Sequence, residues 1–227
     1  MSSAKEEKLL IPGSAGMLEL AFREGSREGI FASRGYCAVV CHPHPLHGGT
    51  MDNKVVTTLV RTYVELGVPV ARFNFRGVGA SEGCHDQGIG EVDDLRRVVE
   101  WLKLRIGSNR VLLAGFSFGA GVVSSACFAL ADVVHGVFVA PPVGRYNFAP
   151  DQPGGSELVA RGGYPCPFCV VMGGRDELVD PAQVYAWART LNPAPDIIAI
   201  PEASHFFHGQ LVRLREELAA VLLRQLG

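Results

Sequence analysis

The feature that most constrains the fold is the Gly-Phe-Ser-Phe-Gly pentapeptide at residues 115–119, because of the segments on either side of it. A short apolar run, residues 110–114, precedes it, and a run of small residues, 120–126, follows and is typical of a helix. A serine at the centre of such a pentapeptide, between a strand and a helix, is expected on a very sharp turn, where a Cβ at either glycine would collide with a neighbouring element. The sequence therefore predicts that Ser117 is presented at the end of a strand. The alternative interpretation is a tight turn whose serine only caps the helix.

Short apolar runs rich in β-branched residues alternate with segments of helical period along the chain. Apolar stripes predict helices over 54–66, 91–106 and a C-terminal segment that begins near Leu211. We expect strands at Leu18–Phe22, Tyr36–Cys41, Pro69–Phe75, Arg110–Gly115, Val134–Ala140, Phe168–Met172 and Asp196–Ile200. The middle strands are almost continuously apolar, as in parallel sheets covered on both faces. The alternation predicts an α/β protein, a three-layer αβα sandwich with a mostly parallel, twisted sheet, formed as a single domain over residues 1–227.

Composition excludes several classes of function. Hydrophobic residues make up 48% of the chain and charged residues 19%, and the net charge is −2 with acids and bases interspersed. Such a balance argues against a nucleic-acid partner and against a charged membrane surface. The chain begins with polar residues, and no apolar run approaches the roughly 18 residues of a membrane helix. We expect a cytoplasmic protein, either a monomer or a homodimer.

The six cysteines are expected to be thiols rather than a disulfide framework, as in a cytosolic chain of this size. Cys166 and Cys169 have the C-x-x-C spacing of a redox motif. A redox pair opens a helix, whereas Cys169 already belongs to the apolar run 168–172, so a redox role is disfavoured. A zinc site at this pair lacks a second pair of ligands.

A serine nucleophile needs a base that takes its proton and a carboxylate that orients the base. After Ser117, the first carboxylate at a strand end is Asp176, and His205 follows the next apolar strand. The carboxyl ends of parallel strands meet at one edge of a sheet, so these three side chains are predicted to converge there.

Each of these residues also has a purely structural explanation. An aspartate after a strand often caps the next helix, and a histidine beside two phenylalanines is often a buried one with a backbone partner. Glu177, Asp180 and Glu202 are rival carboxylates. Asp180 directly precedes Pro181 and has the pattern of a helix cap, and the two glutamates fit the orienting role less well.

Five motifs in a fixed order resemble the α/β-hydrolase superfamily, and the resemblance extends over nearly the whole chain. They are Cys41–Gly49, Phe73–Gly83, the serine pentapeptide, Gly174–Asp176 with Val179, and Ser204–Phe207. The chain looks most similar to small, lidless bacterial serine hydrolases related to dienelactone hydrolase. The resemblance implies catalytic roles for Ser117, Asp176 and His205, in agreement with the interpretation from the residues alone. Dienelactone hydrolases use a cysteine at the position of Ser117, so their substrate is not assumed for this chain.

Two backbone N–H groups are expected to bind the oxyanion that forms during acyl transfer. One belongs to the residue after the nucleophile, and the other to the loop after the strand Tyr36–Cys41. The first is Phe118. In the loop, Pro43 and Pro45 have no N–H, which leaves His44 as the second donor. His44 and Phe118 are therefore the predicted substrate-binding residues, although His44 and His47 also fit a simple role on the rim of the cleft.

Two further patterns are weaker. His42, His44 and His47 lie close together, but prolines separate the first two and no further ligand follows in the loop, so no metal is expected. The Arg76–Gly79 segment lacks the third glycine of a dinucleotide-binding loop, because Glu82 stands in its place, and no cofactor is expected. Arg76 is instead predicted to tie down neighbouring carbonyls or carboxylates.

Superfamily members often carry a lid after the sixth strand. The corresponding interval, 141–167, is rich in proline and glycine and has room for one short helix near 156–161, so no large lid is expected. Aromatic residues are expected to line the open cleft or add apolar surface near it; they are Tyr146, Phe148, Tyr164, Phe116, Phe118, Phe206 and Phe207. Such a cleft favours small-molecule esters with small or medium acyl groups, cleaved through an acyl-enzyme. A peptidase or thioesterase with the same residues, and a binding protein without catalysis, remain alternatives.

Overall fold

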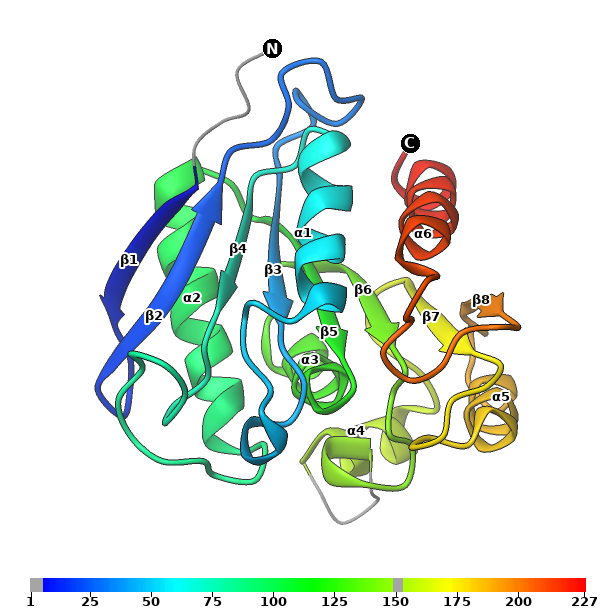
Figure 1. Ribbon diagram of the computed structural model, residues 1–227. Helices are drawn as coiled ribbons and strands as arrows, with labels where there is room; N and C mark the ends of the chain where they lie inside the picture. The colour runs from blue at the N-terminus through cyan, green and yellow to red at the C-terminus, as the bar shows by residue number, and fades with distance from the viewer. Residues whose placement is uncertain (1–5, 149–152) are drawn as a thin grey trace.

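The computed structural model describes residues 6–148 and 153–227, and its strands form one twisted sheet (Figure 1). The strands are β1 (Glu7–Pro12), β2 (Met17–Arg23), β3 (Tyr36–Cys41), β4 (Val70–Phe73), β5 (Arg110–Phe116), β6 (Val133–Val139), β7 (Phe168–Gly173) and β8 (Asp196–Ile200). They lie in the order β1-β2-β4-β3-β5-β6-β7-β8. The pairings of β2 with β1 and with β4 are antiparallel, and every other pairing in this order is parallel.

All seven predicted strands form, and the structure adds β1, which was not expected. β1 is an edge strand whose side chains are exposed or half-buried except Ile11. An edge strand pairs with only one neighbour and can therefore carry polar residues such as Glu7 and Lys8. These two residues interrupt the apolar pattern that would have predicted the strand.

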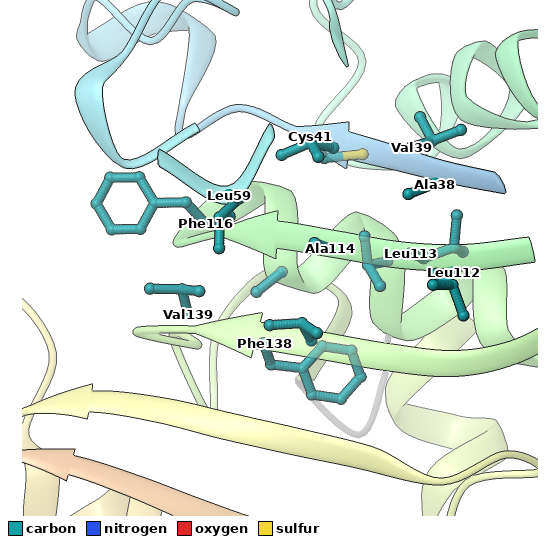
Figure 2. Packing of buried hydrophobic residues seen from close by; sticks show 14 of the residues in the cluster. Ala38, Val39, Cys41, Leu59, Leu112, Leu113, Ala114, Phe116, Phe138 and Val139 are labelled. Carbon is teal, nitrogen blue, oxygen red and sulfur yellow. The ribbon is translucent and has the colours of Figure 1, made fainter. Parts of the chain in front are cut away.

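The buried core lies on the central strands. Every side chain of β3, β4 and β7 is buried, and β5 is buried from Val111 onward. Figure 2 shows Val39, Leu113 and Phe138 from three neighbouring strands packed in this region. Burial on both faces explains why these strands are apolar at nearly every position.

Helices cover both faces of the sheet, which confirms the predicted three layers. They are α1 (Lys54–Glu65), α2 (Gly90–Ile106), α3 (Phe118–Ala129), α4 (Pro153–Arg161), α5 (Pro181–Arg189) and α6 (Leu211–Leu226), with single 3₁₀ turns η1 (Pro45–His47) and η2 (Tyr146–Phe148). α1 and α6 pack together on one face, and α2 and α3 pack on the other (Figure 1). Asp180 caps α5 through a hydrogen bond from the N–H of Ala182 (2.9 Å), as its place before Pro181 predicts.

The carboxyl ends of the parallel strands lie together at one edge of the sheet, the lower edge in Figure 1. The segment 141–167 lies at this edge and contains η2 and α4 but no large lid in its described part. α4 includes the helix expected near 156–161. In the described ranges, no helix is both long and apolar enough to cross a membrane.

Candidate active site

The turn at Ser117 is as sharp as its glycines predict. Ser117 has φ 54° and ψ −118°, a strained conformation for a residue with a side chain. A Cβ on Gly115 would lie 2.2 Å from the carbonyl oxygen of Gly119, and a Cβ on Gly119 would lie 2.5 Å from that of His42. The Ser117 side chain makes no capping hydrogen bond with its helix, so the interpretation as a simple helix cap is not supported.

The structure brings Ser117, His205 and Asp176 into one chain of hydrogen bonds. His205 Nε2 lies 3.1 Å from Ser117 Oγ, and His205 Nδ1 lies 2.7 Å from Asp176 Oδ2. An ionised carboxylate only accepts hydrogen bonds, so Nδ1 carries the proton and Nε2 is free to accept from the serine hydroxyl. The imidazole and the carboxylate are almost completely buried, whereas Ser117 is half-buried and open to the cleft.

The backbone around Asp176 fixes its carboxylate. Its Oδ1 accepts from the N–H groups of Leu178 (2.9 Å) and Val179 (2.8 Å), which leaves Oδ2 for His205. Glu177 does not orient the imidazole; its Oε2 accepts from the backbone N–H of His205 (3.1 Å) and so holds the loop that carries it. This supporting role of Glu177 was not expected from the sequence, where it appears only as a rival carboxylate.

A cavity of about 400 Å³ opens beside Ser117 and His205. Phe118, Tyr146 and Phe206 line it, as expected, together with Leu178 and Val179. Its polar lining residues are His44, His47, Asn53 and Arg145 besides the serine and histidine already named. The cavity therefore combines an apolar wall with several hydrogen-bond donors.

Four of the expected aromatics are buried and do not line the cavity, although Phe116 lies beside the chemistry as expected. Phe116 is fully buried and packs against the ring of His205 at 5.0 Å between centroids, and Phe207 is also fully buried. Phe148 packs against Phe138, and Tyr164 is buried with its hydroxyl 2.6 Å from Ser124 Oγ. Aromatic residues near a strand end fill the core as readily as they line a cleft, and composition does not separate the two.

His44 lies in the loop after β3, and its ring packs beside Phe118. It precedes η1, and its Nδ1 accepts from the N–H of Leu46 (3.2 Å). Its ring centroid is 4.9 Å from that of Phe118, the first residue of α3. The N–H of a first helical residue has no acceptor within the helix, so that of Phe118 remains available to a ligand. Burial lowers the pKa of His44, and the nearby His85 and His47 lower it further.

His42 has a structural role. It is fully buried, with Nε2 accepting from the N–H of Phe75 (3.0 Å) and Nδ1 within 2.6 Å of the carbonyl oxygen of Pro43. The imidazole is therefore neutral with its proton on Nδ1, and it joins the loop after β3 to the loop after β4. Burial lowers its pKa to about 4.

This histidine makes stability depend on pH. His42 has a pKa of about 6.5 in the unfolded chain and about 4 in the folded chain. Between these pH values the unfolded chain binds a proton at His42 and the folded chain does not, so stability falls as the pH falls. We expect the free energy of unfolding to lose about 2–3 kcal/mol through this residue between pH 7.5 and pH 4.5. Urea unfolding of the native protein and of His42→Asn at both pH values measures it, because the asparagine does not titrate. A difference between the two proteins that stays constant with pH would contradict the assignment.

The other motifs are structural in this arrangement. Arg76 ties down its surroundings as expected, with hydrogen bonds to the carboxylate of Asp94 (2.8 Å) and the carbonyl oxygen of Gly90 (2.5 Å). Cys166 lies against the thiol of Cys127, both Cys166 and Cys169 are free thiols, and burial raises the pKa of the Cys169 thiol. Within residues 6–148 and 153–227, no group of three or more His, Cys, Asp or Glu side chains is arranged to hold a metal ion.

Comparison with known proteins adds independent evidence. A model of the alpha/beta hydrolase family matches residues 38–163. An uncharacterized protein of Rickettsia prowazekii, RP471, is 33% identical over 197 residues, which are 81% of this chain and 79% of that protein.

Two solved structures are similar over nearly their whole length. The protein XC6422 of Xanthomonas campestris, a serine hydrolase without a lid, has a TM-score of 0.86 and 39% identity, covering 97% of this chain and 94% of that one. An alpha-beta serine hydrolase homologue from Coxiella burnetii has a TM-score of 0.84 and 40% identity, covering 95% and 97%. The closer relation to dienelactone hydrolase stays a prediction. Fold, sequence and matching family model agree, and the chain belongs to the alpha/beta hydrolase family.

Proposed function

We propose that this hydrolase cleaves small or medium carboxylic esters through an acyl-enzyme on Ser117. The observation that carries the proposal is the continuous hydrogen-bond chain from Ser117 through His205 to Asp176, which opens on a cavity of about 400 Å³. A strained serine, a buried imidazole and a buried carboxylate, held by three separate loops, are the parts of a nucleophilic acyl-transfer site.

The mechanism follows from the protonation states. His205 Nε2 takes the proton of Ser117 as Oγ attacks the ester carbonyl, and the imidazolium formed is stabilised by Asp176. His205 then gives this proton to the leaving alcohol. Water, activated by the same nitrogen, hydrolyses the acyl-enzyme, and the proton returns to Ser117.

The developing oxyanion is assigned to the N–H groups of Phe118 and His44. The N-terminus of α3 adds its positive dipole end to this position. One such donor contributes about 3–4 kcal/mol to transition-state stabilisation in a known serine hydrolase. The apolar wall of Leu178, Val179 and Phe206 would receive the acyl group, and the modest cavity sets an upper limit on its length.

A fluorophosphonate probe followed by a substrate series tests the proposal. We expect the probe to label Ser117, as identified by mass spectrometry of the labelled peptide. We expect p-nitrophenyl esters of short and medium acids to be turned over faster than the palmitate ester. A matched set of ester, thioester and anilide with the same acyl group separates esterase from thioesterase and peptidase activity.

Two outcomes would overturn the proposal. Absence of labelling would indicate a binding protein that keeps the fold without the chemistry. Equal or faster turnover of the thioester or the anilide would replace the ester as the substrate class while keeping the residues in their roles.

A further inference from the structure

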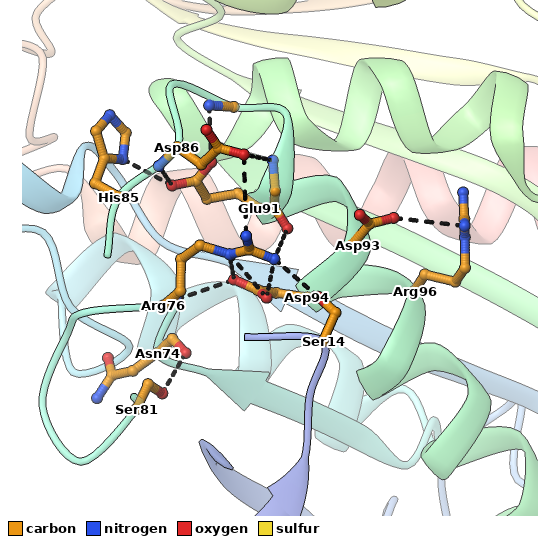
Figure 3. A network of polar contacts seen from close by, with 12 residues as sticks. Ser14, Asn74, Arg76, Ser81, His85, Asp86, Glu91, Asp93, Asp94 and Arg96 are labelled. Carbon is orange, nitrogen blue, oxygen red and sulfur yellow. Dashed lines mark hydrogen bonds and ion pairs between the residues drawn. The ribbon is translucent and has the colours of Figure 1, made fainter. Parts of the chain in front are cut away.

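A second imidazole–carboxylate pair joins His85, in the segment between β4 and α2, to Glu91 at the start of α2 (Figure 3). His85 Nδ1 is 2.7 Å from Glu91 Oε1, a close contact that lacks the alignment of a hydrogen bond. The Glu91 side chain is fully buried, and only 12% of the His85 side chain is exposed. Burying a carboxylate destabilises a protein unless hydrogen bonds and charges compensate for the lost water. The burial of Glu91 therefore needs a structural explanation.

Glu91 is held in place from several sides. Its two carboxylate oxygens accept from the N–H groups of Asp86 and Gly88, each at 2.8 Å. It is the second residue of α2, where the helix dipole favours a negative charge. The neighbouring Arg76–Asp94 pair fixes the same segment to α2. His85 is therefore carried by a rigid support.

The ring of His85 contacts both residues assigned to the oxyanion hole. Its centroid lies 5.0 Å from that of His44 and 5.5 Å from that of Phe118, and these two lie 4.9 Å from each other. His44 belongs to the loop after β3 and Phe118 to the start of α3, so the packing of these rings joins the two segments that carry the assigned N–H groups. Among the described residues, His44 and Phe118 line the cavity beside Ser117, and His85 lies behind them rather than in its lining.

We propose that His85, held by Glu91, is a positioning residue that keeps the N–H groups of His44 and Phe118 at the spacing an oxyanion requires. The inference rests on the proposed function, because it assumes that these two N–H groups bind the oxyanion. It assigns His85 and Glu91 to transition-state stabilisation rather than to substrate binding or proton transfer.

His85→Phe tests the proposal, because phenylalanine keeps an aromatic ring but loses the contact with Glu91. We expect kcat for p-nitrophenyl acetate to fall about tenfold with KM within twofold of the native value, since a small displacement of an oxyanion donor weakens only the transition state. The affinity for a trifluoromethyl ketone, which forms the tetrahedral oxyanion on the serine, should fall by the same factor.

A double-mutant cycle identifies the partner. If His85 acts through Glu91, the single variant Glu91→Gln should lower kcat by the same factor as His85→Phe. The double variant, which carries both changes, should lower kcat by that factor once and not by its square. The double variant also removes the unpaired buried charge that His85→Phe leaves, so it protects the test against a loss of folding. Arg96→Ala, on the exposed part of the same helix, is the matched control and should keep native kcat.

The outcomes separate the two proposals. A native protein that fails to hydrolyse esters or to react with the fluorophosphonate refutes the proposed function and, with it, this inference. A native protein that is active, with variants whose melting temperature falls while kcat and ketone affinity stay within twofold, overturns this inference alone and leaves His85 a structural residue.

Discussion

Replacement of Ser117 by alanine is expected to lower kcat for a short p-nitrophenyl ester by about 10⁶, to the level left by binding and the oxyanion hole. In the proposed mechanism His205, whose Nε2 lies 3.1 Å from Ser117 Oγ, activates this hydroxyl, and alanine offers no atom that can form the acyl bond. The fold should persist, because the Ser117 side chain makes no capping hydrogen bond and its backbone N–H still donates to Val139 (2.8 Å). Steady-state kinetics and a thermal melt measure both effects.

Ser108→Ala is the matched control for this variant. Ser108 lies just before β5, at the opposite end of the strand that leads to Ser117, and its hydroxyl bonds backbone groups of Gly35 and Arg110, far from the site. It should keep native kcat. Retention of more than a hundredth of the native rate by the Ser117 variant would remove the acyl-enzyme from the mechanism.

Replacement of Asp176 by asparagine is expected to lower kcat by about 10⁴. The amide oxygen must face the N–H groups of Leu178 and Val179, which directs the NH₂ group toward His205. The imidazole then accepts at Nδ1 and carries its proton on Nε2, where it can no longer accept the proton of Ser117. The effect therefore comes from the wrong tautomer, while the geometry stays nearly native.

Asp180→Asn makes the same chemical change four residues further on. Asp180 caps α5, and asparagine is an equally good cap, so this control should keep native kcat and stability. The comparison of the two variants by steady-state kinetics isolates the orienting role. A loss of less than tenfold in the Asp176 variant would assign the orientation of His205 to another group.

The sequence predicts most of the fold, because burial on both faces leaves a strong pattern. β3 and β7 are apolar at every position and fully buried, and helices with one apolar stripe cover them. β1 escapes prediction because only Ile11 is buried in it, so neither alternation nor a continuous apolar run is evident. An edge strand buries few side chains, so it needs few apolar residues and leaves only a weak apolar pattern in the sequence.

The candidate site divides in a similar way. Ser117, Asp176 and His205 each follow an apolar strand, so topology alone predicts that they converge. Glu177 and Glu91 act through hydrogen bonds from backbone N–H groups, and no sequence motif predicts such contacts. Tyr164 was expected at the cleft and is buried, because its hydroxyl finds a partner in Ser124 that spacing along the chain does not reveal.

The strand order has a consequence for how this protein can be altered. β6 lies between β5 and β7, and the segment of residues 141–167 that follows it supplies no member of the hydrogen-bonded trio in its described part. A longer insert grafted after β6 would roof the cleft and reshape its selectivity, while the reacting groups stay anchored on the strands at either side. The gap between the serine and the aspartate strands is thus the natural entry point for redesigning which molecules this hydrolase accepts.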